Sequence, residues 1–301
     1  MAFSNSIALA ENFLPILDEV YKRESLTSVL DAANSDIRFL GGNKVELLKL
    51  TVQGLGDYSR NNGYADGAVT AVWEPHTLSQ DRGRRFMVDT MDNEESLGMA
   101  FGRLAGEFLR TQAIPEIDAY RFASLAASAT QGNTVAAAIT PGTTDVVGAI
   151  DLAEATMNDN EVPMEGRILF VSETTYRGLK KDIVRTTFNA EGNIERYIET
   201  FDGMRVIRVP AGRFYTAIDL NDGTTSGEEA GGYAAASGAK AINFMIVSPS
   251  AVRAVIKHNP VNIISPEANQ THDGYLMKYR LYHDIFVLDN KVNGIYLHKG
   301  V

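Results

Sequence analysis

Cysteine is missing from this chain of 301 residues. Its absence excludes disulfide bonds, thiolate nucleophiles and metal sites with cysteine ligands, so packing and noncovalent polar contacts must hold the fold together. Long apolar runs are missing too, since no stretch approaches the roughly 20 residues that span a bilayer. The N-terminus has no basic segment and reaches an acidic residue at Glu11, unlike a secretory signal. We therefore expect no membrane partner and synthesis in the cytoplasm.

A surplus of basic residues is missing as well. The chain has 28 Lys and Arg residues against 38 Asp and Glu residues, which gives a formal net charge of −10. This balance argues against a protein that grips nucleic acid by a broad basic face. The hydrophobic share of 45% and the charged share of 22% are ordinary for a folded protein. At this length we expect one large lobe or two to three modest ones.

Motifs that carry chemistry are also absent. No nucleophile elbow, Walker loop or dinucleotide fingerprint occurs. The five histidines lie in unrelated contexts, with no pair at metal-ligand spacing: His76, His258, His272, His283 and His298. The acidic residues between Asp89 and Glu95 are better explained as partners of a helix start than as catalytic carboxylates. The sequence predicts no catalytic, cofactor or metal site, so a cytosolic α/β enzyme is the least favoured function.

A long helical pattern is present between Asp92 and Ser128. Its apolar residues fall at helical spacing on one face: Leu97, Phe101, Leu104 and Phe108. Proline lacks an N–H donor and clashes with the preceding turn, so Ile114-Pro115 should kink the helix or split it. We expect a bent helical spine of roughly 50 Å, at about 1.5 Å per residue.

Residues 37–90 favour extended structure. Val45 to Val52 and Ala68 to Trp73 have the composition of strands, and glycine-bearing turns separate them from further extended pieces. The segment therefore predicts a long two-stranded loop. Charged residues are spread among its apolar positions, which indicates little apolar surface to bury within itself. Because an isolated ribbon is marginal in water, we expect it to lie on another surface, such as a neighbouring subunit.

The charged residues of this loop are the predicted contact residues. Its dense basic cluster, Arg82, Arg84 and Arg85, could touch phosphate. On a ribbon in an acidic protein, pairing with the carboxylates of a neighbouring subunit is favoured. The full set of predicted intersubunit contact residues is Glu46, Lys49, Asp57, Arg60, Arg82, Arg84 and Arg85.

Two strand-to-helix units are expected in the second half of the chain. Arg167 to Val171 is an apolar run, and Ser172 is a suitable cap for a helix that follows it. The same pattern recurs at Ile242 to Val247, with Ser248 as cap and Pro249 as the first helical residue. The sequence therefore predicts a helix after each of the two strands.

The two ends of the chain and one loop complete the pattern. Residues 1–36 suggest short helices that form a docked, detachable arm rather than a core element. Residues 221–238 are rich in Gly, Ala, Ser and Thr and predict a surface loop. Residues 275–299 alternate apolar and polar side chains and predict three short strands, separated at His283-Asp284 and at Asp289 to Gly294.

The order of these elements is an arm, a two-stranded loop, a kinked spine helix, a central α/β lobe and a return through strands. Four local segments add to it: Arg84 to Asp89, Ile114 to Arg121, Arg167 to Ser172 and Phe286 to Tyr296. Together they resemble the major capsid protein of tailed bacteriophages, with the Hong Kong ninety-seven type fold. The resemblance covers nearly the whole chain and rests on the order of the segments.

The resemblance implies an α+β fold with four regions. Residues 1–36 would be the N-terminal arm and residues 37–90 the extended two-stranded loop. Residues 91–145 with 259–301 would form the peripheral domain, which carries the long kinked spine helix. Residues 146–258 would form the axial domain.

Members of this family are structural proteins that assemble into pentamers and hexamers of an icosahedral shell around double-stranded DNA. The resemblance therefore implies that the main partner is the chain itself, without a cofactor. Portal and scaffolding proteins, and in some relatives a decoration protein, are further implied partners. DNA would be contacted weakly and without sequence specificity. The protein would reside in the virion capsid, after assembly in the host cytoplasm.

One alternative shares the same fold. An encapsulin-type nanocompartment shell holds cargo enzymes in place of DNA. The arm followed directly by the extended loop favours the phage reading, and the short arm leads us to expect a separate scaffolding protein.

Overall fold

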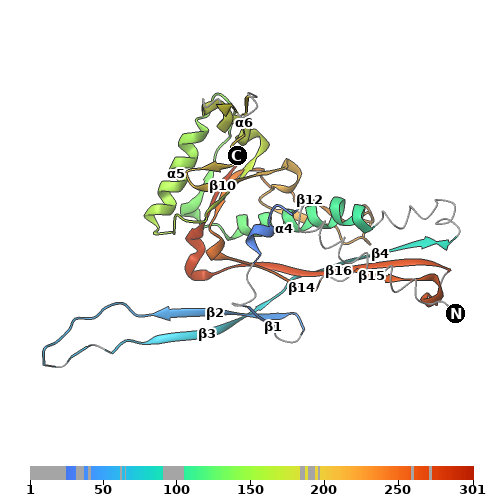
Figure 1. Cartoon of the computed structure of the whole chain (residues 1–301), viewed down its shortest axis with the longest axis horizontal. Coiled ribbons are helices and arrows are strands. Elements are labelled where there is room, and N and C mark those ends of the chain that lie inside the picture. Colours follow the sequence, from blue (N-terminus) through green and yellow to red (C-terminus); the bar gives the residue numbers. More distant parts are fainter. Residues whose placement is uncertain are drawn as a thin grey trace.

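The structure is a computed structural model of the chain. It describes residues 25–31, 37–39, 42–61, 63–64, 66–90, 105–183, 187–188, 194–195, 197–258, 261–270 and 273–301. Figure 1 shows three parts: a lobe that carries helices α5 (Val146–Asp159) and α6 (Glu173–Asp182), a long narrow sheet, and a hairpin that projects away from both. The predicted start of the long helix, with Leu97, Phe101 and Leu104, lies outside the described residues.

The lobe is built on a six-stranded sheet with the order β5-β17-β13-β6-β10-β9. Its strands are β5 (Thr134–Ala136), β6 (Ile168–Ser172), β9 (Thr200–Phe201), β10 (Met204–Val209), β13 (Ile242–Val247) and β17 (Ile295–Lys299). Strand β6 is a continuous apolar run because both of its faces are buried. Leu169 and Val171 pack in the cluster with α5 and α6, whereas Ile168 and Phe170 pack on the opposite side with helix α4 (Ile114–Ser128).

Side-chain caps fix where the two outer helices of the lobe begin. The Asp145 carboxylate accepts a hydrogen bond from the Gly148 N–H at 2.9 Å at the start of α5. The Ser172 hydroxyl accepts one from the Thr175 N–H at 3.2 Å at the start of α6. Such caps satisfy N–H groups that have no partner within the helix. The helix predicted after Ser172 is confirmed.

The proline in the long helix is accommodated without a break. Helical residues run from 105 to 128, and a π-helical turn, η3 (Leu109–Ala113), directly precedes α4. In this turn the Ile114 N–H bonds to the Leu109 carbonyl, five residues back. Widening by one residue makes room for Pro115, which has no N–H to donate. The predicted interruption at Ile114-Pro115 is thus a π turn rather than a split into two helices.

The long sheet is organised around one strand, β16 (Gly274–Val287), which pairs with three antiparallel partners. These partners are β4 (Gln80–Asp89), β14 (Val252–His258) and β15 (Val261–Ile264). The prediction that His283-Asp284 separates two short strands is wrong. Both side chains are buried, and the Asp284 carboxylate accepts hydrogen bonds from the Ser79 N–H and the Tyr120 hydroxyl, each at 2.8 Å. A polar pair with buried partners does not need a turn.

The second predicted strand-to-helix unit is also wrong. After Ser248 only a 3₁₀ turn forms, η6 (Pro249–Ala251), and the chain then continues as strand β14. Val252 and Ala254 are buried in one apolar cluster and Val255 in another, so the strand is covered on both faces. β-Branched residues favour such a strand, and pairing with β16 supplies its backbone hydrogen bonds.

Residues 25–31 are fixed to helix α4 by a buried polar network. The Asp118 carboxylate, 0% exposed, accepts hydrogen bonds from the Leu26 and Thr27 N–H groups at 3.1 and 3.2 Å. The Arg121 guanidinium, also buried, donates to the Thr27 carbonyl at 3.2 Å and to the Asp31 carboxylate at 2.7 Å. This part of the predicted detachable arm is therefore a core element. The rest of the arm lies outside the described residues.

The projecting hairpin consists of β2 (Lys44–Val52) and β3 (Val69–Thr77), which pair antiparallel over their full length. The predicted two-stranded loop is confirmed for residues 44–77, whereas β4, which the prediction also placed in the loop, pairs with β16 in the long sheet. Strand β1 (Ile37–Phe39) adds a short third strand at the base of the hairpin. Two smaller pairs are β7 (Thr187–Phe188) with β8 (Ile194–Glu195) and β11 (Ile218–Leu220) with β12 (Tyr233–Ala235). Strand β12 lies inside the segment predicted to be a loop.

Short 3₁₀ turns connect several of these elements. They are η1 (Ser28–Leu30), η4 (Gln131–Asn133), η5 (Ala211–Arg213), η7 (Pro266–Ala268) and η8 (Asp289–Gly294). Among the described residues, no helix combines the length and the apolar character needed to cross a bilayer.

Candidate intersubunit surface

One face of the β2–β3 hairpin is apolar and uncovered. The register places Leu48 opposite Trp73, Leu50 opposite Ala71, and Val52 opposite Val69. Side chains of directly opposed residues lie on the same face of a sheet, so these three pairs form one continuous strip. Its large side chains are 39 to 69% exposed. The predicted mixing of charged and apolar residues is wrong for the outer half of β2, because strand alternation places Leu48, Leu50 and Val52 on one face and Lys49 on the other.

The base of the hairpin is anchored to the body by the opposite face. Val45 is buried against Leu78 and Val255. Further out on the same face, the Lys49 Nζ lies 3.2 Å from the Asp289 carboxylate and 3.6 Å from Glu74. The hydrogen bond to Asp289, followed by the charge of Glu74, raises the pKa of Lys49. The structure therefore gives Lys49 partners within its own chain.

The hairpin tip carries exposed aromatic side chains. Tyr58 and Tyr64 are 62% and 87% exposed, and their rings contact each other edge to face with centroids 4.9 Å apart. Leu55 is fully exposed beside them. Two of the predicted contact residues, Asp57 and Arg60, are also exposed at this tip.

Strand alternation divides the predicted basic cluster on β4. Arg82 and Arg84 lie opposite Leu281 and Tyr279 on the face toward helix α4, whereas Arg85 is on the other face, opposite Lys278. The Arg82 guanidinium is bidentate to the Glu116 carboxylate at 2.7 and 3.2 Å.

Arg82 and Arg84 also bind the loop between β11 and β12. Arg82 donates to the Asn221 and Gly232 carbonyls at 2.8 and 3.2 Å. Arg84 donates to the Glu229 carbonyl at 3.0 Å. Gly223 and Gly231 have positive φ, and an added Cβ there would come within 2.9 and 3.2 Å of the Arg84 guanidinium. Glycine therefore allows the loop to close around this side chain.

The seven predicted contact residues thus occupy separate places. Glu46 and Lys49 lie near the hairpin base, Asp57 and Arg60 at its tip, and the three arginines on β4. Their role in contacts between subunits stays a prediction. Sequence reasoning missed the apolar strip, although the alternation of Leu48, Leu50 and Val52 was a usable signal.

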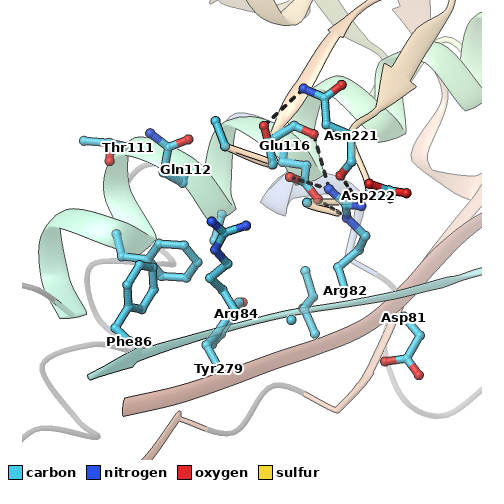
Figure 2. A pocket seen from close by; sticks show the side chains of 18 of the residues that line it. Asp81, Arg82, Arg84, Phe86, Thr111, Gln112, Glu116, Asn221, Asp222 and Tyr279 are labelled. Atoms are coloured by element: carbon cyan, nitrogen blue, oxygen red, sulfur yellow. Dashed lines mark hydrogen bonds and ion pairs between the residues drawn. The ribbon is translucent and has the colours of Figure 1, made fainter. Parts of the chain in front are cut away.

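A cavity of about 580 Å³ lies between β4, the π turn and the β11–β12 loop. Its apolar wall is formed by Phe86, Phe108 and Tyr279. The centroid of the Phe108 ring lies 4.8 Å from that of Phe86 and 5.7 Å from that of Tyr279. Thr111 and Gln112 of the π turn add polar groups. Figure 2 shows the Arg84 side chain rising from β4 between Phe86 and the Arg82–Glu116 pair. π Turns of this kind are often found at functional sites.

Four carboxylates line this cavity, and each is bound within the chain. Glu116 pairs with Arg82, Asp81 with Arg280 and Glu107 with Arg110. Asp222 accepts hydrogen bonds from the Thr224 and Thr225 N–H groups at 2.7 Å, which lower the pKa of its carboxyl. In the part of the chain that the structure describes, no three or more His, Asp or Glu side chains are placed to hold a metal ion.

Comparison with known proteins finds similarity in structure rather than in sequence. No protein-family model matches the sequence. No curated protein matches it either. A structure from Mycobacterium phage Che8 matches with a TM-score of 0.57 at 16% identity, covering 92% of this chain and 91% of that one. The mature capsid of bacteriophage PhiM1 matches with a TM-score of 0.56 at 12% identity, covering 86% and 82%.

A virus-like particle from Pyrococcus furiosus also matches, with a TM-score of 0.50 at 15% identity, covering 94% of this chain and 95% of that one. The chain therefore has the mixed α/β fold of phage capsid structures. This fold was expected from the order of its elements, and that expectation is confirmed.

Proposed function

We propose that this chain is the major coat subunit of a tailed-bacteriophage head. Copies assemble into pentamers and hexamers that close an icosahedral shell around the double-stranded DNA genome. The fold supports this proposal, and the observation that carries it is the uncovered apolar strip of the hairpin. A contiguous apolar face of this kind marks a surface that another molecule covers.

The hairpin is suited to contacts between copies of the chain. The apolar strip lies on a projection, and one copy would place its hairpin on a different surface of the next copy. Such head-to-tail contacts generate closed rings when the rotation closes. Removing the strip from water would favour the contact by roughly 25 cal/mol for each Å² of apolar area, before the cost of association is subtracted.

The regions of the chain would take the following places in the shell. Residues 37–90 would be the extended loop, with its last strand, β4, joined to the long sheet by pairing with β16. Residues 91–145 with 259–301 would be the peripheral domain with its spine helix, and residues 146–258 the axial domain. Strands β5 and β17, from the peripheral ranges, complete the six-stranded sheet of the axial lobe. This shared sheet would make the two regions move as one unit.

Other partners follow from the same proposal. A portal, a separate scaffolding protein and a decoration protein would bind the shell, and packaged DNA would be contacted weakly. The net charge of −10 fits a container, because a strongly basic lining would hold DNA tightly through counterion release. The subunit would be structural and not catalytic, assembled in the host cytoplasm and resident in the virion.

Assembly of the purified chain tests the proposal. Electron microscopy and sedimentation should show pentamers, hexamers or closed shells. Leu50→Lys, on the apolar strip, should remain folded by circular dichroism but fail to assemble. Thr51→Lys is the matched control, since Thr51 is the next residue on β2 and lies on the opposite, exposed face. A wild-type chain that stays a stable monomer under assembly conditions would refute the coat-subunit proposal.

A nanocompartment shell that encloses enzyme cargo is the second candidate. The match to the virus-like particle, which covers 94% of this chain, favours it. The contents of particles recovered from the natural source separate the two functions. Packaged DNA supports the phage head, whereas enclosed enzyme in place of DNA supports the nanocompartment.

A further inference from the structure

We propose that the cavity beside Arg84 receives the hairpin tip of a second copy of this chain. Tyr58 and Tyr64 of one copy would enter among the aromatic side chains of the other copy, and Asp57 would pair with the Arg84 guanidinium. This inference rests on the proposed function, and it names which two surfaces meet.

The cavity has the size and lining of a binding site. Its volume of about 580 Å³ lies within the ~300–1,000 Å³ typical of such sites, which are mostly apolar with a few placed polar groups. Phe86, Phe108 and Tyr279 provide the apolar part, and aromatic rings pack favourably edge to face or offset. Such a wall suits aromatic side chains of an incoming segment.

Arg84 is exposed and gives the cavity a positive charge. The four lining carboxylates are already bound to Arg82, Arg280, Arg110 or backbone N–H groups. Among the described residues, the Arg84 guanidinium donates a hydrogen bond to a neutral acceptor, the Glu229 carbonyl, and no carboxylate lies within ion-pair distance of it. An occupant that brings a carboxylate would therefore form a charge-assisted hydrogen bond, which is stronger than a neutral one.

The hairpin tip supplies the matching groups. Tyr58 and Tyr64 are its exposed aromatic residues, and Asp57 directly precedes Tyr58. Tyrosine is enriched among the residues that dominate the energy of protein interfaces. The tip thus combines aromatic rings with a carboxylate, as the cavity requires.

A chain cannot fill its own cavity with its own tip. In Figure 1 the hairpin tip lies at one end of the molecule, whereas β4, α4 and β12, which frame the cavity, lie toward the other. The tip and the cavity are different surfaces, so their contact is head-to-tail and repeats from copy to copy. This is the type of contact that a closed ring of subunits needs.

Engineered disulfides test the contact. Because the chain has no cysteine of its own, any disulfide must involve the introduced residues. The double variant Tyr58→Cys with Gln112→Cys should give a ladder of interchain multimers on a non-reducing gel after mild oxidation of assembled particles. A disulfide forms only when the two Cα atoms approach within about 7 Å. The matched control is Tyr58→Cys with Leu152→Cys, since Leu152 is exposed on α5, away from the cavity.

A charge exchange gives a second readout. Asp57→Arg and Arg84→Asp should each weaken association about tenfold or more, as expected for loss of a hydrogen bond to a charged group. The double variant should recover most of that loss. Circular dichroism checks that each variant folds, and analytical ultracentrifugation measures association.

The outcomes separate this inference from the proposed function. Particles that form normally, without a ladder or with an equal ladder in the Leu152 control, overturn the tip-in-cavity contact and leave the coat-subunit proposal standing. A wild-type chain that never associates overturns both. A ladder specific to Gln112, with recovery in the charge-exchange double variant, supports the contact.

Discussion

Strands β3 and β4 follow each other in the chain, yet β3 projects into solvent whereas β4 lies against the body of the subunit. Each pairs along its whole length with one antiparallel neighbour, β3 with β2 and β4 with β16. The inner face of β4 is covered in part, because Phe86 and Val88 pack in one apolar cluster with Leu109 and Ile117 of the neighbouring helix. The corresponding strip on β2 and β3 has no cover among the residues that the structure describes. Complete backbone pairing therefore does not make a ribbon self-sufficient; its apolar face also needs a partner.

The largest loss of stability is expected from breaking the buried polar network that joins residues 25–31 to helix α4. Asp118→Ala removes a buried carboxylate that pairs with Arg213 at 3.2 Å, and it would leave the Thr27 N–H and hydroxyl without their acceptor. Breaking a buried charged network of this kind costs about 3 to 5 kcal/mol. Urea unfolding monitored by circular dichroism measures the change. A loss below about 1 kcal/mol would show that residues 25–31 are held mainly by apolar packing.

The apolar packing between helix α4 and β16 should contribute nearly as much to stability. Ile117 is 1% exposed and packs with Met277, Tyr279 and Leu281 beneath β16. Ile117→Ala should lower the free energy of unfolding by about 2 to 5 kcal/mol through lost packing and the cavity that remains. Phe108, which is only half-buried, should tolerate Phe108→Ala better. Equal losses in the two variants would contradict this ranking of burial.

A smaller effect should come from His283, which lies beneath Tyr120 on the covered side. The ring is 2% exposed, and burial, followed by the charges of Arg121 and Arg82, lowers its pKa to about 3. A lowered histidine pKa means that the folded state excludes the proton. Stability is therefore full above about pH 6.5 and falls by about 1.4 kcal/mol for each pH unit below it.

This pH dependence can be isolated between pH 5 and 6.5, above the usual range of carboxyl titration. His283→Phe should flatten most of the slope of unfolding free energy against pH in that window. Burial also lowers the pKa of His298, so a smaller slope of the same sign should remain. An unchanged slope in the variant would assign the titration to other groups.

The smallest effect on stability is expected on the uncovered strip. Leu50 is 56% exposed, so Leu50→Ala should change the unfolding free energy by no more than about 0.5 kcal/mol. Assembly should nevertheless weaken, because the side chain is covered only in the shell. Measured beside Ile117→Ala, this variant separates residues that hold the subunit from residues that join subunits. A large loss in the isolated subunit would show that the strip is already covered in one chain.

Local patterns predicted several elements correctly. The hairpin follows from two strand-like runs separated by turns, and the helix after Ser172 follows from its cap. Both depend on residues close together in the chain. The Val252–His258 segment was predicted to be helical because Ser248-Pro249 is a typical helix start. The structure forms only a 3₁₀ turn there. What overrides this helix start is pairing with β16, which starts more than 15 residues away.

The sequence by itself determined where strands and helices have strong local signals, and it determined that no disulfide holds them together. Only the tertiary structure decided that His283 and Asp284 continue a strand, that Arg82 pairs with Glu116, and that Arg84 and Arg85 face opposite sides. The reason is physical. Periodicity and capping act over a few residues, whereas burial and ion pairing depend on which distant segments meet.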